Sequence, residues 1–305
     1  MIKTEIYENA LFETIKRGAT VISDDVKDAF TAAIAREARP DAKNGLTATL
    51  QSMEMSEKRE NPLCVDTGWP IFYFKVGNKC ELEGGFMALE ESARRAVAKA
   101  TKLGYLRATM KHPLTGYDPG DNIGMNIPDF TYKFVEGDGI EISYAAKGGG
   151  SECFGGTRHR IVAFADGIKG IEKFVIDSFV ASARAGAVCP PSVLGIGIGG
   201  TANVAANLAK EAACLRTVGS HHPDPMFRKI EEDLYAALNS LDIGILGAGG
   251  STSVLAVNVE YAYTHIAGIA CATSTNCMVA RRASTRIYAD GRVMRMKSPM
   301  WFGDR

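Results

Sequence analysis

The sequence predicts a mixed α and β protein in which a helical opening precedes a two-lobed α/β region. Three observations support this class. Apolar residues recur at helical spacing up to about residue 60, an aromatic and β-branched run follows, and glycine-rich turns separate the apolar runs of the second half. No linker rich in proline or serine divides the chain. We therefore expect one domain over residues 1–305, with its core over about 61–290.

The first half predicts helices, then a strand and a further helix. The opening helices are indicated by two apolar series, Ile6, Ala10, Leu11 and Ile15, then Val26, Phe30, Ala33 and Ile34. The aromatic and β-branched run over 71–77 predicts a strand, and the amphipathic pattern after Gly85 predicts a helix. Residues 111–130 are rich in Pro, Gly, Asp and Asn, so we expect mostly loop there.

The middle of the chain predicts two strands around a turn at 137–139, a combination typical of a hairpin. A helical pattern follows over 170–186 and is expected to stop at Gly186. Two later segments, starting at Val193 and at Asp242, both pass from apolar residues into a glycine-rich turn and then into small and hydroxylated residues. They are either two copies of one unit or two ordinary tight turns.

Charge and cysteine content exclude several classes of function. The 305 residues include 35 basic and 35 acidic ones, so the charge gives no indication of nucleic acid or an anionic membrane as partner. No apolar run resembles a signal peptide or a membrane span. Seven scattered cysteines, an odd number, argue against a disulfide framework. We expect a cytoplasmic protein whose cysteines are either small core residues or ligands.

Three cysteines lie where turn-forming residues interrupt an apolar run, a setting in which ligands and catalytic groups concentrate. They are Cys64 in NPLCVDTG, Cys189 in AVCPPSVLGIGIGGT and Cys277 in TSTNCMVARRAS. The other four look different: Cys80, Cys153, Cys214 and Cys271. For any single cysteine, a small buried hydrophobe is the ordinary role.

Four motifs, CVDTG, KGGGSE, CPP-x5-GIGGT and NC-x3-RR, occur in this order between about residues 60 and 285. With them the sequence resembles the α-subunit of the class I iron–sulfur hydro-lyases, the family of the two-subunit fumarate hydratases and the L(+)-tartrate dehydratases. The resemblance implies a [4Fe–4S] cluster bound by Cys64, Cys189 and Cys277. It also implies reversible hydration of a small dicarboxylate of the fumarate/malate type, with tartrate or mesaconate as alternative substrates.

A set of three thiolates suits this chemistry. Iron–sulfur clusters are normally held by four thiolates, so three leave one iron able to bind a substrate hydroxyl and carboxylate as a Lewis acid. Cys271 competes with Cys277 for the third position because it lies only slightly earlier in the chain. We favour Cys277, since its Asn-Cys-x3-Arg-Arg context matches the family and Cys271 lies in apolar sequence.

Two catalytic residues are implied by the same resemblance. Asp66 matches the proton donor or acceptor at the substrate carbon, and His265 matches a histidine near the active site. Without the resemblance, Asp66 in its Asp-Thr-Gly turn would be a capping residue, and His265 in its apolar run would be a satisfied core histidine.

Two groups are expected to bind the substrate. Arg107 corresponds to a family arginine that binds a substrate carboxylate, a bidentate task that suits a guanidinium; a surface salt bridge is the alternative. Gly148, Gly149 and Gly150 follow a predicted strand, where glycines let backbone N–H groups approach an anion closely. For them the alternative is a simple hairpin end.

The resemblance fails at Val65, where family members commonly have glutamine. Valine cannot donate the hydrogen bond that the glutamine amide gives to a substrate carboxylate, and a buried carboxylate that lacks a donor costs about 1–3 kcal/mol. A substrate with a methyl or other apolar group at that end would be accommodated better than fumarate.

Two other kinds of protein match parts of the sequence. Gly195, Gly197 and Gly200 satisfy the spacing of a dinucleotide-binding fingerprint, but no acidic residue ends a second strand about 20 residues later, as a nicotinamide-dependent dehydrogenase requires. A zinc or structural thiolate protein could use Cys271, Cys277 and His265, but the paired spacings typical of zinc sites do not occur.

A partner chain is also expected. In the family a β-type domain, fused or separate, completes the active site, and this chain ends soon after its third cysteine motif. We expect a separate β-type subunit and an α2β2 or larger assembly.

Overall fold

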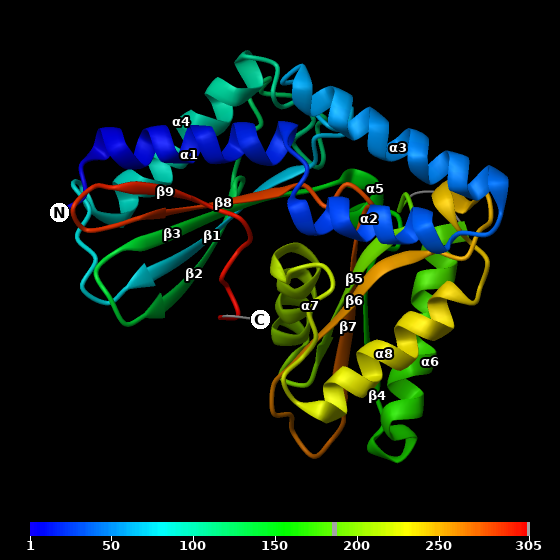
Figure 1. Cartoon of the computed structure of the whole chain (residues 1–305). Coiled ribbons are helices and arrows are strands. Elements are labelled where there is room, and N and C mark those ends of the chain that lie inside the picture. The colour runs from blue at the N-terminus through cyan, green and yellow to red at the C-terminus, as the bar shows by residue number, and fades with distance from the viewer. Residues whose placement is uncertain (185–187, 304–305) are drawn as a thin grey trace. The chain divides into compact units, whose positions relative to one another are not determined.

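The computed structural model describes residues 1–184 and 188–303. These form two compact units, here called unit 1 and unit 2 (Figure 1). Unit 1 comprises residues 1–23, 53–147 and 281–301, and unit 2 comprises residues 24–52, 148–280 and the C-terminal residues from 302. Both contain helices and a β-sheet, which confirms the predicted mixed α/β class.

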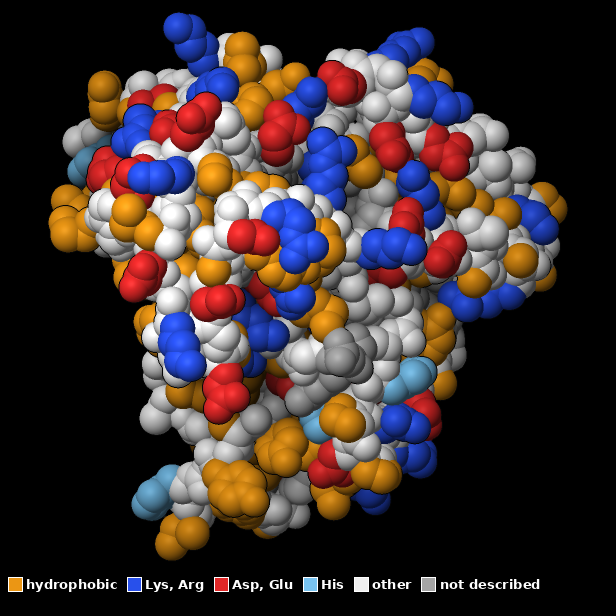
Figure 2. Space-filling model, turned by 60° about the vertical axis from the view of Figure 1, so that its left-hand side comes forward, with side chains coloured by type: hydrophobic (Ala, Val, Ile, Leu, Met, Phe, Trp, Pro, Cys, Tyr) orange, Lys and Arg blue, Asp and Glu red, His pale blue; other side chains and the backbone are white. Residues whose placement is uncertain are grey.

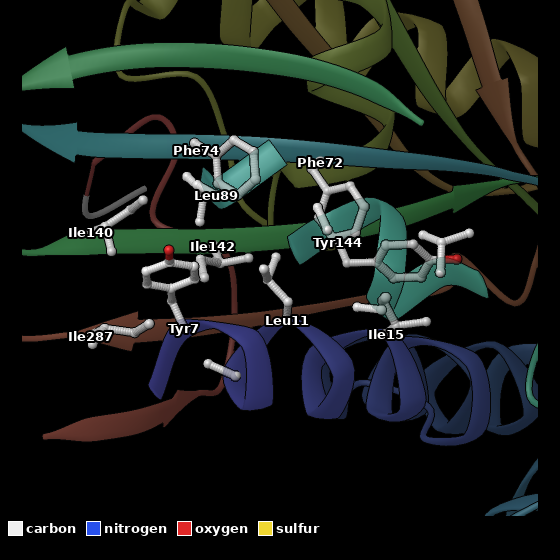
Figure 3. Packing of buried hydrophobic residues seen from close by; sticks show 14 of the residues in the cluster. Tyr7, Leu11, Ile15, Phe72, Phe74, Leu89, Ile140, Ile142, Tyr144 and Ile287 are labelled. Carbon is white, nitrogen blue, oxygen red and sulfur yellow. The ribbon is translucent and has the colours of Figure 1, made fainter. Parts of the chain in front are cut away.

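Unit 1 is a five-stranded sheet with two helices packed on one face. The strand order is β2-β1-β3-β8-β9. Its elements are α1 (Thr4–Thr20), β1 (Trp69–Gly77), α4 (Gly85–Lys102), β2 (Asp129–Val135), β3 (Ile140–Lys147), β8 (Arg282–Ile287) and β9 (Val293–Met296). Figure 3 shows Leu11 and Ile15 of α1 facing the sheet, where they pack with Phe72 and Tyr144; all four are fully buried. Their burial fixes α1 on the sheet.

The predicted hairpin is wrong, because β1 lies between β2 and β3. β1 runs parallel to β2, with Ile71 opposite Asp129, and antiparallel to β3, with Trp69 opposite Lys147. Burial accounts for this order. Nearly every residue of β1 is buried, as in a central strand, whereas no residue of β2 is fully buried and β2 is an edge strand.

Unit 2 is a four-stranded sheet of order β4-β7-β5-β6 with helices on both faces. Its elements are α2 (Asp24–Arg36), most of α3 (Pro40–Lys58), α5 (Gly149–Cys153), β4 (Thr157–Val162), η1 (Phe164–Asp166), α6 (Gly167–Arg184), β5 (Ser192–Ile198), α7 (Ala202–Leu215), α8 (Pro225–Asn239), η2 (Ile245–Gly247), β6 (Val254–Tyr261) and β7 (Ile269–Asn276). Alternate residues of β5 serve the two faces. Leu194 and Ile196 join the core with α6 and α8, and Gly195 and Gly197 lie against α7.

The two glycines of β5 allow α7 to lie directly on the strand. A Cβ atom added to Gly195 would stand 2.0 Å from the carbonyl oxygen of Ala209, and one added to Gly197 would stand 1.9 Å from that of Ala205. Both obstacles are helix backbone and cannot move aside as a side chain could. The fingerprint spacing therefore reflects close packing between helix and strand.

Gly197→Ala is expected to destabilise unit 2 by about 1–3 kcal/mol, because the added methyl group forces α7 away from β5. Urea unfolding measures the change. Gly124→Ala is a suitable control, since its new Cβ would meet no heavy atom within 4 Å. Equal stability of the two variants would contradict this explanation of the glycine pattern.

The predicted helices are present, and the two glycine-rich segments differ from each other in structure. The helical opening is confirmed by α1, α2 and α3. The helix expected over 170–186 is α6, although its predicted stop at Gly186 lies outside the described residues. The two glycine-rich segments are separate turns: the first leads from β5 into α7, and the second forms η2 and leads into β6. They are not copies of one unit.

The surface agrees with the balanced composition. Acidic and basic side chains lie interspersed over the face drawn in Figure 2. Among the described residues, no helix combines the length and the apolar character needed to cross a membrane.

Candidate active site

The segment that contains Cys64 and Asp66 joins α3 to β1. Both side chains are partly buried, whereas Val65 between them is 80% exposed. A carboxylate oxygen of Asp66 accepts a hydrogen bond from the backbone N–H of Gly68 at 3.0 Å. The buried guanidinium of Arg281 donates to the carbonyl oxygen of Asp66. The Asp66 backbone is thus held by an arginine of the NC-x3-RR motif, a link between two motifs that the sequence alone did not reveal.

Arg107 lies beside this segment. The Thr67 hydroxyl accepts from the backbone N–H of Arg107 at 2.9 Å and donates to its carbonyl oxygen at 3.3 Å. The Arg107 residue itself is exposed. Within unit 1, the structure therefore brings together the Asp66 segment and Arg107, which lie about 40 positions apart in the sequence.

Cys189 and Cys277 are neighbours at one end of the two central strands of the unit 2 sheet, β5 and β7. Cys189 precedes β5, Cys277 follows β7, and the two strands are antiparallel with Val193 opposite Asn276. The start of β5 and the end of β7 therefore lie side by side at the same end of the sheet. The backbone N–H of Met278 donates to the carbonyl oxygen of Cys189 at 3.2 Å. Two of the three predicted ligands are thus neighbours.

Cys271 lies at the other end of β7, opposite Ile198 of β5. It is fully buried in the apolar core of unit 2, and burial raises the pKa of its thiol to about 12. Such burial disfavours the thiolate form, which metal ligation requires. Cys271 therefore has the properties of a core residue.

His265 is placed apart from the cysteine pair. It lies in the loop between β6 and β7. This loop is at one end of the strands, and Cys189 and Cys277 are at the other end. The length of β7 puts about 25 Å between these two ends of the sheet. The side chain is exposed, and its Nδ1 accepts from the N–H of Ala267 at 3.2 Å. His265 is neither a buried core histidine nor a neighbour of the predicted ligands in unit 2.

The glycine run follows β3, as predicted. Gly148 is the N-cap residue of the five-residue helix α5, which starts at Gly149. The carbonyl oxygen of Gly148 accepts from the N–H of Glu152 at 3.0 Å and from the hydroxyl of Ser151 at 3.0 Å. Gly148, Gly149 and Gly150 thus begin a short helix, which corrects the alternative of a simple hairpin end.

The rival zinc site is not assembled. Cys271 and Cys277 lie at opposite ends of β7, so they cannot bind one ion. More generally, no three His, Cys, Asp or Glu side chains within residues 1–184 and 188–303 are gathered closely enough to hold a metal ion. Cys64 belongs to unit 1, and Cys189 and Cys277 belong to unit 2.

Comparison with known proteins identifies the class of protein. The sequence matches the family described as "Fumarate hydratase (Fumerase)" over residues 8–286, and the chain belongs to this family. Its members are named for the addition of water to a double bond, so the predicted hydro-lyase class is confirmed.

Individual relatives are named more narrowly. A protein of Methanocaldococcus jannaschii named "Putative L(+)-tartrate dehydratase subunit alpha" is 37% identical over 287 residues, which cover 93% of this chain and 99% of the relative. "L(+)-tartrate dehydratase subunit alpha" of Escherichia coli strain UTI89 is 33% identical over 287 residues, and that of strain K12 is 32% identical. Each alignment with the Escherichia coli proteins covers 92% of both chains.

Proposed function

We propose that this chain is the α-subunit of a [4Fe–4S]-dependent hydro-lyase that reversibly hydrates a small dicarboxylate of the fumarate/malate type. The observation that carries the proposal is the meeting of Cys189 and Cys277 at one sheet edge, in a chain of the fumarate hydratase family. L(+)-tartrate is the second candidate substrate, because relatives that match over nearly the whole chain are named for it.

The residues around the cysteine pair fit an anionic group. The hydroxyl oxygens of Ser192 and Thr252 are buried and have no hydrogen-bond partner among the described residues. Ser192 begins β5, and Thr252 shortly precedes β6. The two strands are parallel, so both residues lie at the same end of the sheet as the cysteine pair. Buried hydroxyls without partners are costly, so such donors favour an anion at this edge. Thiolates are the usual ligands of iron–sulfur clusters.

Cys64, Cys189 and Cys277 would hold the cluster. Bound through three thiolates, it supplies a Lewis acid that assists the departure of a hydroxyl group. The chain's own residues supply the remaining functions. The exposed Arg107 guanidinium binds a substrate carboxylate in bidentate fashion, while the Gly148–Gly150 backbone provides further anion-binding N–H groups.

Asp66 transfers a proton at the substrate carbon. Its hydrogen bond from the Gly68 N–H fixes one carboxylate oxygen and leaves the partly buried side chain oriented within its turn. A catalytic role for His265 stays a prediction; within unit 2 its loop lies at the end of the sheet opposite the two cysteines.

A second, β-type chain completes the site, in an α2β2 or larger assembly. It supplies the base that takes a proton from the water molecule that becomes the substrate hydroxyl group. The names of the relatives, each a "subunit alpha", support this part of the proposal. Anaerobic assays of fumarate, malate and tartrate with this chain alone and with the second chain provide the test. Full activity of the 305-residue chain alone would exclude a split active site, and no turnover of any of these acids by the assembly would exclude the hydro-lyase proposal.

Val65→Gln is expected to shift the substrate preference toward fumarate. The exposed Val65 side chain offers no donor, and a glutamine amide restores the hydrogen bond to an unsubstituted carboxylate end. The ratio of kcat/KM for fumarate to that for mesaconate should rise by about 10-fold. Val65→Ile, which adds only a methylene group, should leave the ratio unchanged. An unaltered ratio in Val65→Gln would remove Val65 as a determinant of specificity.

A further inference from the structure

Arg107 lies outside every helix and strand, so no regular hydrogen-bond ladder fixes its backbone. Two side chains perform this task. The Thr67 hydroxyl bonds both the N–H and the carbonyl oxygen of Arg107, at 2.9 and 3.3 Å. The Asn122 amide donates to the same carbonyl oxygen at 3.0 Å. Thr67 and Asn122 are 3% and 2% exposed, so water does not compete for these bonds.

The side-chain amide of Asn122 is fixed by four hydrogen bonds. Besides its bond to Arg107, its Nδ2 donates to the Thr101 hydroxyl at 3.0 Å. Its Oδ1 accepts from the N–H groups of Thr109 and Met110, at 2.9 and 3.2 Å. Both donors and both acceptor positions of the amide are therefore used. Its φ of 63° lies in the left-handed region, which asparagine tolerates better than most residues.

Thr67 also connects Arg107 to the proton-transfer residue. It follows Asp66 directly and lies within the turn that the Asp66 carboxylate closes with the Gly68 N–H. The backbone that carries the Arg107 guanidinium is thereby held to the same three-residue turn as the Asp66 carboxylate. The placement of these two groups matters for catalysis, because a 1 Å misplacement of a catalytic or substrate-binding group can lower the reaction rate by about 100-fold.

We propose that Thr67 and Asn122 are positioning residues that hold the Arg107 backbone in register with Asp66. This inference rests on the proposed function, in which Arg107 binds a substrate carboxylate. Neither residue contacts the substrate itself. Both act through Arg107, and this dependence separates them from residues that merely stabilise the fold.

Two variants break the contact without removing the surroundings. Thr67→Val keeps the shape of the side chain and deletes both bonds to Arg107. Asn122→Asp keeps an acceptor for the N–H groups of Thr109 and Met110 but loses the donors to Arg107 and Thr101. In the assembled enzyme each should raise KM by about 10-fold or more and change kcat much less. Thr67→Ser, which keeps the hydroxyl, should restore the normal KM.

The deciding experiment is a double-mutant cycle with Arg107→Ala. Binding of succinate, an unreactive four-carbon dicarboxylate, is measured by calorimetry on each form of the assembled enzyme. Thr67→Val should weaken succinate binding by about 10-fold in the wild-type background and should have no further effect once Arg107 is alanine. The same pattern is expected for Asn122→Asp. Equal losses in both backgrounds, or no loss in either, would overturn the proposal.

Thr14→Val is the matched structural control. The Thr14 hydroxyl is fully buried in unit 1 and bonds the carbonyl oxygen of Ala10 and the hydroxyl of Thr285, away from Arg107. It should lower the Tm and leave succinate binding unchanged; weakened binding in this control would show that general loss of stability explains the effect. Failure of the wild-type assembly to bind succinate would instead refute the proposed function, and this inference with it.

Discussion

Cys277→Ser is expected to yield a protein without the visible absorbance of an iron–sulfur cluster and with hydration activity reduced by at least about 100-fold. Cys277 follows β7 at the end where its neighbour Cys189 precedes β5, so the substitution removes one of the two adjacent cysteines that we propose as ligands. Cys189→Ser and Cys64→Ser should have the same effect. The measurements are the visible spectrum after anaerobic purification and the initial rate with fumarate in the assembled enzyme.

Cys271→Ser is the informative comparison for that result. It lies on the same strand but is fully buried, with the pKa of its thiol raised to about 12 by that burial. A hydroxyl in this apolar core should lower the Tm and leave the spectrum intact. Cys80→Ser and Cys214→Ser should likewise keep the cluster. Loss of the absorbance in Cys271→Ser, with retention in Cys277→Ser, would reverse the ligand assignment.

Asp66→Asn is expected to lower kcat by about 100- to 10,000-fold with little change in KM, because an amide cannot transfer the proton. The substitution is nearly isosteric, and the amide oxygen can still accept the hydrogen bond from the N–H of Gly68. The fold and the binding of the substrate should therefore be preserved. Steady-state kinetics and succinate binding, measured on the same preparation, separate the two effects.

Asp118→Asn provides a control with the same local geometry. Asp118 closes an Asp-Pro-Gly turn, in which its carboxylate accepts from the N–H of Gly120 at 2.8 Å, just as Asp66 accepts from Gly68. This variant should have normal kinetics. Were Asp66→Asn to lose no more activity than Asp118→Asn, Asp66 would be a turn-capping residue and not the acid or base.

The sequence predicted the local structure better than the order of the strands. Apolar periodicity located the opening helices and α4, and the aromatic run located β1. The insertion of β1 between β2 and β3 was missed, because the turn over 137–139 is compatible with a hairpin. Which strands pair depends on how much apolar surface each one buries against α1 and α4, and this is a property of the assembled core.

The candidate site was predictable only where residue type reveals the chemistry. Cysteines in turns, an aspartate and an arginine can be selected by their reactivity and by family resemblance. Thr67 and Asn122 could not, since a threonine or an asparagine in a loop is ordinary until its hydrogen-bond partners are known. The separation of His265 from the cysteine pair likewise depends on the direction in which β7 runs.

The most direct test of the central claim is the metal content and visible spectrum of the protein purified without oxygen. We expect a brown protein with broad iron–sulfur charge-transfer absorbance, which contains iron and acid-labile sulfide in equal amounts. A colourless protein that contains zinc, or one that takes up no iron and sulfide on anaerobic reconstitution, would contradict the assignment of Cys64, Cys189 and Cys277 as cluster ligands.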